Sequence, residues 1–260
     1  MIFCNVSRNF LIACLLFIIP EMLNPSVNST SKDCRMAGDG IMGGMLDSVL
    51  DHPETFVRLL EAALTQSSLP GVAAQKKMAS ANRPWTPAVG ETPRQSAVLA
   101  LLHPSPEGVA LLFTLRPSRL AHHGGQVSFP GGGKEEGDLS LVETALRETR
   151  EELGLDTAEV RILGPLTSLY IASSRNMVHP FVGWTPRLST LRPDAQEVAE
   201  VLTVTLRRLL DPATLSTCVR EANGQTQTFP SFHIAPHHIW GATAMMTSEL
   251  LEIVRPMLAA

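Results

Sequence analysis

A short charged segment with helix signals at both ends constrains this chain most strongly. Ser140 is followed three residues later by Glu143, the spacing of a capping box that satisfies free backbone N–H groups at a helix start. Gly154 is the residue type that ends helices in a left-handed conformation. The sequence therefore predicts a helix over 141–153, LVETALRETREEL.

The predicted helix separates its charged and apolar side chains. At about 100° per residue, Glu148, Glu151 and Glu152 share roughly one third of the circumference. The apolar side chains on the opposite side are Val142, Leu146 and Leu153. We therefore expect the apolar stripe to pack on a sheet while the three carboxylates point outward together.

Two interpretations compete for this glutamate cluster. Most charge runs are simply solvated helix faces. However, Glu148 and Glu152 are like charges at i,i+4, which destabilise a helix, and Arg147 and Arg150 offset only part of that repulsion. Clustered carboxylate oxygens suit a hard divalent cation, so the sequence predicts Mg²⁺ or Mn²⁺ as a cofactor.

Apolar runs of the strand type surround the helix. SAVLALLHP (96–104) and GVALLFTLR (108–116) form a predicted strand pair, and QVSF (126–129) leads into the glycine run Pro130–Gly133. Glycines let backbone approach a phosphate or metal ion closely, although a plain tight turn explains the run equally well. Further strands are expected over 160–166, 177–184, 198–204 and 231–240, and helices over 206–211 and 242–258. Strands interleaved with a few helices predict a mixed α/β or α+β domain.

Composition limits the classes of partner. The 260 residues are 44% hydrophobic, which is enough for a buried core. A net charge of −4 and a single Tyr exclude the basic field and aromatic platform of a nucleic-acid binder. No apolar run approaches the ~18 residues of a membrane span. The expected partner is therefore a small molecule, with neither nucleic acid nor membrane, and a homodimer is left open.

Three regions are expected along the chain. Residues 1–45 form a leader, which is disordered, wrongly assigned or a weak signal, because the apolar run Phe10–Ile19 is too short to span a bilayer. Residues 46–94 contain a helix capped by Asp51 and then a linker over 67–94, rich in Ser, Pro, Gly and Ala. Residues 95–260 form the main domain. The four Cys residues show no CxxC pair, which favours a reducing compartment and a cytoplasmic location.

The segment RETREELGL (147–155), preceded by Gly-Gly and an acidic loop, resembles the Nudix box, G-x5-E-x7-R-E-U-x-E-E-x-G-U, where U is a bulky apolar residue. The matching residues are Arg147, Glu148, Glu151, Glu152, Gly154 and Leu155. Two departures appear. Thr149 occupies the first U position, where the pattern has a bulky apolar residue. When Gly132 is taken as the first glycine of the pattern, Asp138 takes the place of the upstream glutamate, and the loop from there to Arg147 is one residue longer than in the pattern.

A second motif resembles one branch of this family, the coenzyme A pyrophosphatases. The branch pattern LLTxR…GxxxFPGG reads here LFTLRPSRLAHHGGQVSFPGG (112–132), and the IWGATA segment (239–244) is also similar. The residues in register are Arg116, Gly125, Phe129, Pro130, Gly131 and Gly132. The resemblance covers about residues 95–255.

The resemblance implies an α/β/α sandwich with a mixed central sheet, and metal-dependent hydrolysis of coenzyme A to 3′,5′-ADP and 4′-phosphopantetheine. It implies Glu148 and Glu152 as metal ligands, Glu151 as a third ligand or helper, and a carbonyl near Gly132 to complete the site. Arg147 is expected to orient the glutamates, and Asp138 to tether the loop.

The base and the substrate-binding residues are less defined. Glu197 resembles a carboxylate that the branch carries outside the box and competes with Glu151 for the role of general base; a solvated loop glutamate is the simpler explanation. Arg116, Arg119 and His123 form a cationic group suited to phosphate, with Gly131 beside it. An ordinary charged surface loop is the alternative.

Two other functions stay open at this stage. One is hydrolysis of another nucleoside diphosphate, such as an ADP-sugar or a dinucleotide. The other is a Nudix module that binds a nucleotide without turnover, against which the intact glutamate set argues. An isoprenoid diphosphate isomerase shares the fold but lacks a supporting Cys site here.

Overall fold

The computed structural model describes residues 49–260, except 67, 121–122, 223–224 and 259–260. The leader expected over 1–45 therefore lies outside the described residues. Within the described part of the chain, no helix is long and apolar enough to cross a membrane.

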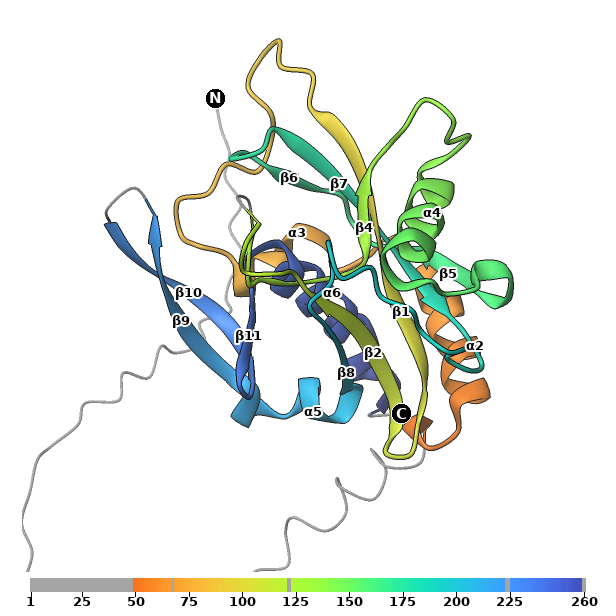
Figure 1. Cartoon of the computed structure of the whole chain (residues 1–260). Helices are drawn as coiled ribbons and strands as arrows, with labels where there is room; N and C mark the ends of the chain where they lie inside the picture. Colours follow the sequence, from red (N-terminus) through yellow and green to blue (C-terminus); the bar gives the residue numbers. More distant parts are fainter. Residues whose placement is uncertain (1–48, 67, 121–122, 223–224, 259–260) are drawn as a thin grey trace, which may run out of the picture. The chain divides into compact units, whose positions relative to one another are not determined.

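An eight-stranded mixed sheet forms the centre of the domain (Figure 1). Its main path runs β3-β2-β1-β7-β5, with β4 paired to β1, β6 to β7 and β8 to β2. The strands are β1 (Arg94–Ser105), β2 (Gly108–Leu115), β3 (Val127–Ser128), β4 (Gly131–Gly133), β5 (Arg161–Pro165), β6 (Leu169–Ile171), β7 (Asn176–Trp184) and β8 (Glu200–Thr205). The β1–β7 pair is parallel and the other pairs are antiparallel, so the sheet is mixed, as the sequence predicted.

Strand β1 is apolar on both sides because each of its faces supports a separate core. Ala97, Leu99 and Leu101 pack with α4 (Leu141–Leu153). Ala100 and Leu102 belong to the larger core, which contains side chains of α2 (Pro53–Leu64) and α6 (Gly241–Leu258). Because successive side chains of a strand point to opposite faces, α4 covers one face of the sheet and α2 and α6 cover the other. The expected α/β/α sandwich is confirmed.

A second, three-stranded antiparallel sheet follows α5 (Leu206–Leu210) and consists of β9 (Leu215–Ala222), β10 (Gln225–Ile234) and β11 (His237–Trp240). The segment 231–240, expected as one strand, is a hairpin in which Ile234 pairs with His237. The turn at Ala235 and Pro236 separates its two halves. Strand β9 was not predicted, because its sequence LSTCVREA lacks a regular apolar alternation.

The stretch 67–94, expected as a linker, contains α3 (Gly71–Gln75) and the 3₁₀ turn η1 (Lys76–Met78). These short helices dock on α6, where Ser248 donates a hydrogen bond to the Ala74 carbonyl at 2.9 Å. The small residues of this stretch allow the close approach, but they gave no apolar pattern from which docking could be predicted.

The start of α2 also differs from the expectation. His52, not Asp51, stands at the N-cap position. The Asp51 carboxylate instead forms an ion pair with Arg207 at 2.8 Å.

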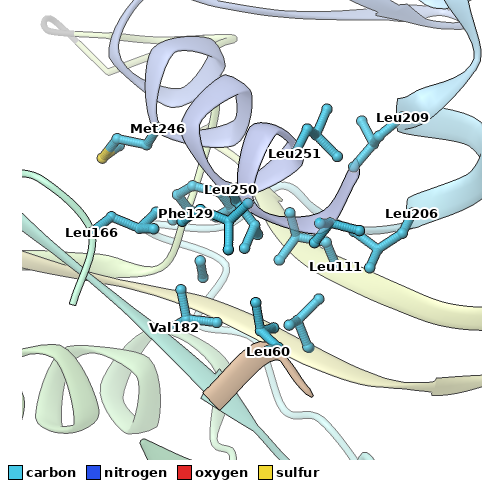
Figure 2. Close-up of a cluster of buried hydrophobic side chains, with 14 of the residues drawn as sticks. Leu60, Leu111, Phe129, Leu166, Val182, Leu206, Leu209, Met246, Leu250 and Leu251 are labelled. Carbon is cyan, nitrogen blue, oxygen red and sulfur yellow. The ribbon is translucent and has the colours of Figure 1, made fainter. Parts of the chain in front are cut away.

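The core beneath α6 should dominate the stability of the domain (Figure 2). Leu250 of α6 is 0% exposed within this core, whereas Leu59 of α2 is 42% exposed. Leu250→Ala should lower the free energy of unfolding by about 2–5 kcal/mol, because it leaves a cavity that the packing cannot close. Leu59→Ala is the matched control and should cost below about 1 kcal/mol. Urea denaturation measures both, and equal losses would contradict this account of the core.

Candidate active site

Helix α4 begins and ends as the sequence predicted. The Ser140 hydroxyl accepts a hydrogen bond from the Glu143 backbone N–H at 3.1 Å, and the Glu143 carboxylate accepts one from the Leu139 N–H at 2.7 Å. Gly154 adopts φ 61° and ends the helix. Backbone N–H groups of Arg192 and Asp194 donate to the Leu153 and Glu152 carbonyls at 2.7 and 2.8 Å. These bonds tie the segment 192–198 to the last turn of α4.

The three glutamates do not point outward together, which corrects the expectation from the helix pattern. Only 3% of Glu152 and 15% of the Glu148 side chain are exposed, compared with 58% of the Glu151 side chain. Glu152 is buried and Glu148 is partly buried because α4 lies against β4, and the glycines of β4 have no side chains to occupy that space. Glu151 turns toward Arg147 and solvent.

The glycine run is a strand rather than a plain turn. A methyl group on Gly132 would lie 2.5 Å from the carboxyl carbon of Glu148. On Gly131, where φ is 148°, it would lie 2.3 Å from the Ala97 carbonyl oxygen. Both positions therefore require glycine. Gly132 leaves space for the Glu148 carboxylate, and Gly131 allows β4 to pair closely with β1.

Arg147 connects the helix, the loop and the strand. Its guanidinium donates to both oxygens of the Asp138 carboxylate at 2.9 and 3.0 Å, and to the Gly133 carbonyl at 2.9 Å. It also lies 3.0 Å from Glu151 and 3.1 Å from Glu148. Arg147 thus fixes Glu148 relative to the loop that precedes α4.

Asp138 is the buried partner in this network. Its carboxylate accepts hydrogen bonds from the Thr144 hydroxyl and the Glu135 N–H, each at 2.9 Å. The hydrogen bonds from Arg147, followed by the bond from Glu135, hold the pKa of Asp138 well below its usual range. Asp138 and Arg147 thus anchor the loop between β4 and α4.

The positive charges near Glu148 and Glu152, from Arg147 and Arg116, do not offset the burial of the two carboxylates. Burial raises the pKa of Glu152 to about 8, and the charges of Glu197 and Glu148 add to the effect. Arg116 and the Gly131 backbone N–H act in the opposite direction. The Oε2 atom of Glu152 is buried without a hydrogen-bond partner. Burial likewise raises the pKa of Glu148.

Glu197 is held next to this pair by the segment 192–198. Its backbone N–H donates to the Asp194 carbonyl at 3.0 Å, and the following Val198 is buried in the core under α4. The negative charge of Glu197 contributes to the raised pKa of both Glu148 and Glu152, so Glu197 lies near them. Sequence separation alone gave no reason for this proximity.

The cationic group expected before the glycine run does not gather at one point. Arg116 lies near enough to Glu152 for its charge to lower the pKa of that carboxyl, and its buried Nε has no hydrogen-bond partner. Arg119 donates to the Ala195 carbonyl at 2.7 Å and so braces the segment that carries Glu197. His123, with φ 58°, contacts Gln126 of its own loop at 3.0 Å.

Sequence reasoning missed a cavity at one end of the sheet. It is lined by Arg94, Gln95, Ser96, Gly133, Lys134 and Asn176. The parallel pairing of β1 with β7 places Arg94 opposite Asn176, more than 80 positions along the chain. No local signal in the sequence reveals such a long-range contact.

Glu148, Glu152 and the glycine strand fit a hard divalent cation. All the available donors are oxygen atoms, Glu152 Oε2 lacks a partner, and the carboxylate of Glu148 occupies the space beside Gly132. Among the described residues, no group of three or more His, Cys, Asp or Glu side chains has metal-binding geometry. The candidate site is therefore a two-glutamate site beside a glycine backbone.

Comparison with known proteins places the chain in a family. Residues 93–222 match the NUDIX domain. The chain belongs to the Nudix family and is a Nudix hydrolase, a class of enzymes that act on pyrophosphate bonds.

Relatives support the same branch as the sequence motifs. The human protein named mitochondrial coenzyme A diphosphatase NUDT8 is 41% identical over 168 residues, which cover 63% of this chain and 71% of that protein. The mouse protein of the same name is 39% identical over 150 residues, covering 56% of this chain and 71% of the relative. A Nudix hydrolase of Photorhabdus laumondii, named NudL and described as uncharacterized, is 34% identical over 162 residues, 62% of this chain and 86% of that protein. The resemblance identified from the sequence is thereby confirmed.

Asp138 should make stability depend on pH. Because folding lowers its pKa, the stability it contributes is fully present above the usual Asp pKa of about 3.9, begins to fall near that pH and is lost progressively toward the lowered pKa of the folded state. Asp138→Asn should therefore lower the melting temperature at pH 7, and its deficit relative to the unmodified chain should shrink toward pH 3.5. Glu136→Gln, in the same loop but exposed, is the control. Thermal melts between pH 3.5 and 7 measure the effect, and a deficit independent of pH would refute it.

Proposed function

We propose that this chain hydrolyses the diphosphate bond of coenzyme A or its derivatives, giving 3′,5′-ADP and 4′-phosphopantetheine or its acylated form. One observation carries the proposal. A glutamate pair, one member buried with an unpartnered carboxylate oxygen and the other partly buried, lies beside a glycine strand in a chain about 40% identical to two coenzyme A diphosphatases. Such a pair suits chemistry on an anionic diphosphate, provided that positive charge is supplied.

Glu148 and Glu152 are the proposed ligands of Mg²⁺ or Mn²⁺, with a carbonyl near Gly132 beside them. When bound, this cation would neutralise phosphate charge, polarise the phosphoryl group and lower the pKa of a bound water. Arg147 holds Glu148 in place through contacts with Asp138 and Gly133. Glu151 is a third ligand only if it leaves Arg147, because the two lie 3.0 Å apart.

Glu197 is the proposed general base. Hydrolysis forms a bond from a water oxygen to phosphorus, breaks the bridging P–O bond and releases a proton that a base must accept. Glu197 lies near both proposed ligands, and its side chain is exposed to solvent. Glu151 is the alternative, but its carboxylate is already engaged in an ion pair with Arg147 at 3.0 Å.

Arg116 and Gly131 are the proposed contacts to the diphosphate. Arg116 lies near Glu152, and its buried Nε has no hydrogen-bond partner, so the guanidinium has donor capacity left for a phosphate oxygen. Arg119 and His123 are kept as proposed substrate contacts of the loop before the glycine strand, although their present contacts lie with Ala195 and Gln126.

The decisive experiment is mass spectrometry of the products after incubation with coenzyme A, with and without Mg²⁺. We expect metal-dependent 3′,5′-ADP and 4′-phosphopantetheine. Loss of a residue that only supports a metal ligand typically lowers activity about 10- to 100-fold. Glu152→Gln removes a proposed ligand itself, so it should lower the rate by more than this and leave the fold intact. Glu136→Gln should keep the rate.

Parallel incubations with ADP-ribose and NADH separate the alternatives. If the chain hydrolyses ADP-ribose or NADH but not coenzyme A, the proposed substrate is wrong and the proposed diphosphate hydrolysis stands. Absence of turnover together with nucleotide binding would favour the non-catalytic module. An active Glu152→Gln variant would contradict the assignment of this residue as a ligand.

Two adjacent glycines give a matched test of the proposed metal site. Gly132→Ala should displace the Glu148 carboxylate, whereas a methyl group on Gly133 meets no atom within 4 Å. We expect Gly132→Ala to weaken Mn²⁺ binding by about tenfold or more and Gly133→Ala to leave it unchanged. Titration of free Mn²⁺ by electron paramagnetic resonance measures both constants. Equal constants for the two variants would show that Glu148 is not a ligand.

The compartment is a further part of the proposal. The cysteine pattern supports the cytoplasm, whereas the human and mouse relatives are named as mitochondrial. Fractionation of cells that express the full chain distinguishes the two locations.

A further inference from the structure

A cavity of about 460 Å³ opens where β1 and β7 begin and β4 ends. Figure 1 shows these strand ends together at one end of the sheet. Its lining contains two cations, two amides, a hydroxyl and a glycine, and no carboxylate. Its size is in the range of sites that hold nucleotide-sized ligands.

The two cations in the cavity keep their charge uncompensated. The Arg94 guanidinium donates to the neutral Ser174 carbonyl at 3.0 Å. Lys134 is exposed, and its backbone N–H bonds to the Gln95 carbonyl at 2.9 Å. Within the described part of the chain, no carboxylate lies within ion-pairing distance of either cation, unlike Arg147 with its acidic neighbours. In a chain of net charge −4, this cavity is suited to an anion.

An amide adds a second kind of recognition to the cavity. Asn176 donates through Nδ2 to the Ser96 hydroxyl, and its Oδ1 is buried without a partner. Gln95 is already engaged, because its Nε2 donates to the Pro93 carbonyl at 3.0 Å and its Oε1 contacts His179 at 2.7 Å. The unpartnered oxygen of Asn176 can accept a hydroxyl or amino proton. The cavity therefore suits a ligand that carries an anionic group for the two cations and a hydroxyl or amino group for Asn176. A phosphorylated ribose or nucleoside has both.

The cavity adjoins the glutamate pair through one strand. Gly133 lines the cavity and gives its carbonyl to Arg147, and the preceding Gly132 faces Glu148. A ligand that lies along β4 can therefore reach both places. Two of the cations expected from the sequence to bind phosphate lie elsewhere: Arg116 is near Glu152, and Arg119 donates to the Ala195 carbonyl.

We propose that this cavity binds the phosphomonoester of the substrate's nucleoside, with Arg94 and Lys134 holding the phosphate and Asn176 accepting a proton from the same nucleoside. For a coenzyme A-type substrate this group is the 3′-phosphate. The inference rests on the proposed function and adds to it the residues that distinguish substrates with this phosphate from those without it.

The test compares coenzyme A with 3′-dephospho-coenzyme A in the full chain with Mg²⁺. Arg94→Gln and Lys134→Gln should each lower kcat/KM for coenzyme A about 10- to 100-fold, mainly through KM, as expected for one lost charge-assisted hydrogen bond. Both should change kcat/KM for the dephosphorylated substrate less than about twofold, since its missing phosphate makes no contact there. Lys134→Arg should retain the preference, and Asn176→Asp should reduce it by repulsion. Melting temperatures establish that each variant is folded.

Arg175→Gln is the control for the general electrostatic field. Arg175 precedes Asn176, is exposed and does not line the cavity. Its replacement should affect both substrates alike, within about twofold.

Three outcomes would overturn the inference. Arg94→Gln and Lys134→Gln could lower kcat/KM equally for both substrates, they could lower neither, or the unmodified chain could hydrolyse both equally well. In each case the proposed function survives.

If neither substrate is hydrolysed, the proposed function fails and calorimetry decides the inference. Tighter binding of 3′,5′-ADP than of 5′-AMP, lost in Arg94→Gln, would support the cavity as a phosphate site. Absence of that preference would overturn it.

Discussion

The bidentate ion pair between Arg147 and Asp138 is the contact on which the site depends. It joins a helix residue to a buried loop carboxylate, and the same guanidinium reaches the carbonyl of the glycine strand and two glutamates. Such a planar, forked donor fixes direction as well as distance. Helix α4, the loop before it and β4 are therefore joined into one unit by a single side chain. Without this unit, the position of Glu148 against Gly132 would have no support from its surroundings.

Around this anchor the fold concentrates negative charge at a place where water is largely excluded. Glu152 is buried and Glu148 partly buried. The segment 192–198 holds Glu197 near them, and Arg116 is the opposing charge that lowers the pKa of Glu152. A buried carboxylate without sufficient compensation is costly. An arrangement of this kind is common at functional sites, because binding and catalysis need groups that the fold alone does not satisfy.

Local signals predicted much of the fold, whereas contacts between distant segments were beyond them. Ser140 and Gly154 gave the bounds of α4, and the apolar runs gave most strands, because capping and alternation act over a few residues. The burial of Glu152 depends on β4 pairing with β1, and the contact of Arg119 with Ala195 spans 76 positions. Helical periodicity placed the glutamates on one side of α4. It could not show that this side faces a glycine strand rather than solvent.

The position of the glutamates along α4 has an electrostatic consequence. Glu148, Glu151 and Glu152 occupy the last part of a helix that ends at Leu153, where the aligned peptide dipoles place a partial negative charge. Helices ordinarily carry cations at this end, so the carboxylates and the helix macrodipole repel each other. A divalent cation at this end would relieve both repulsions together. The ion would then stabilise the folded helix by mass action, in addition to any role in chemistry.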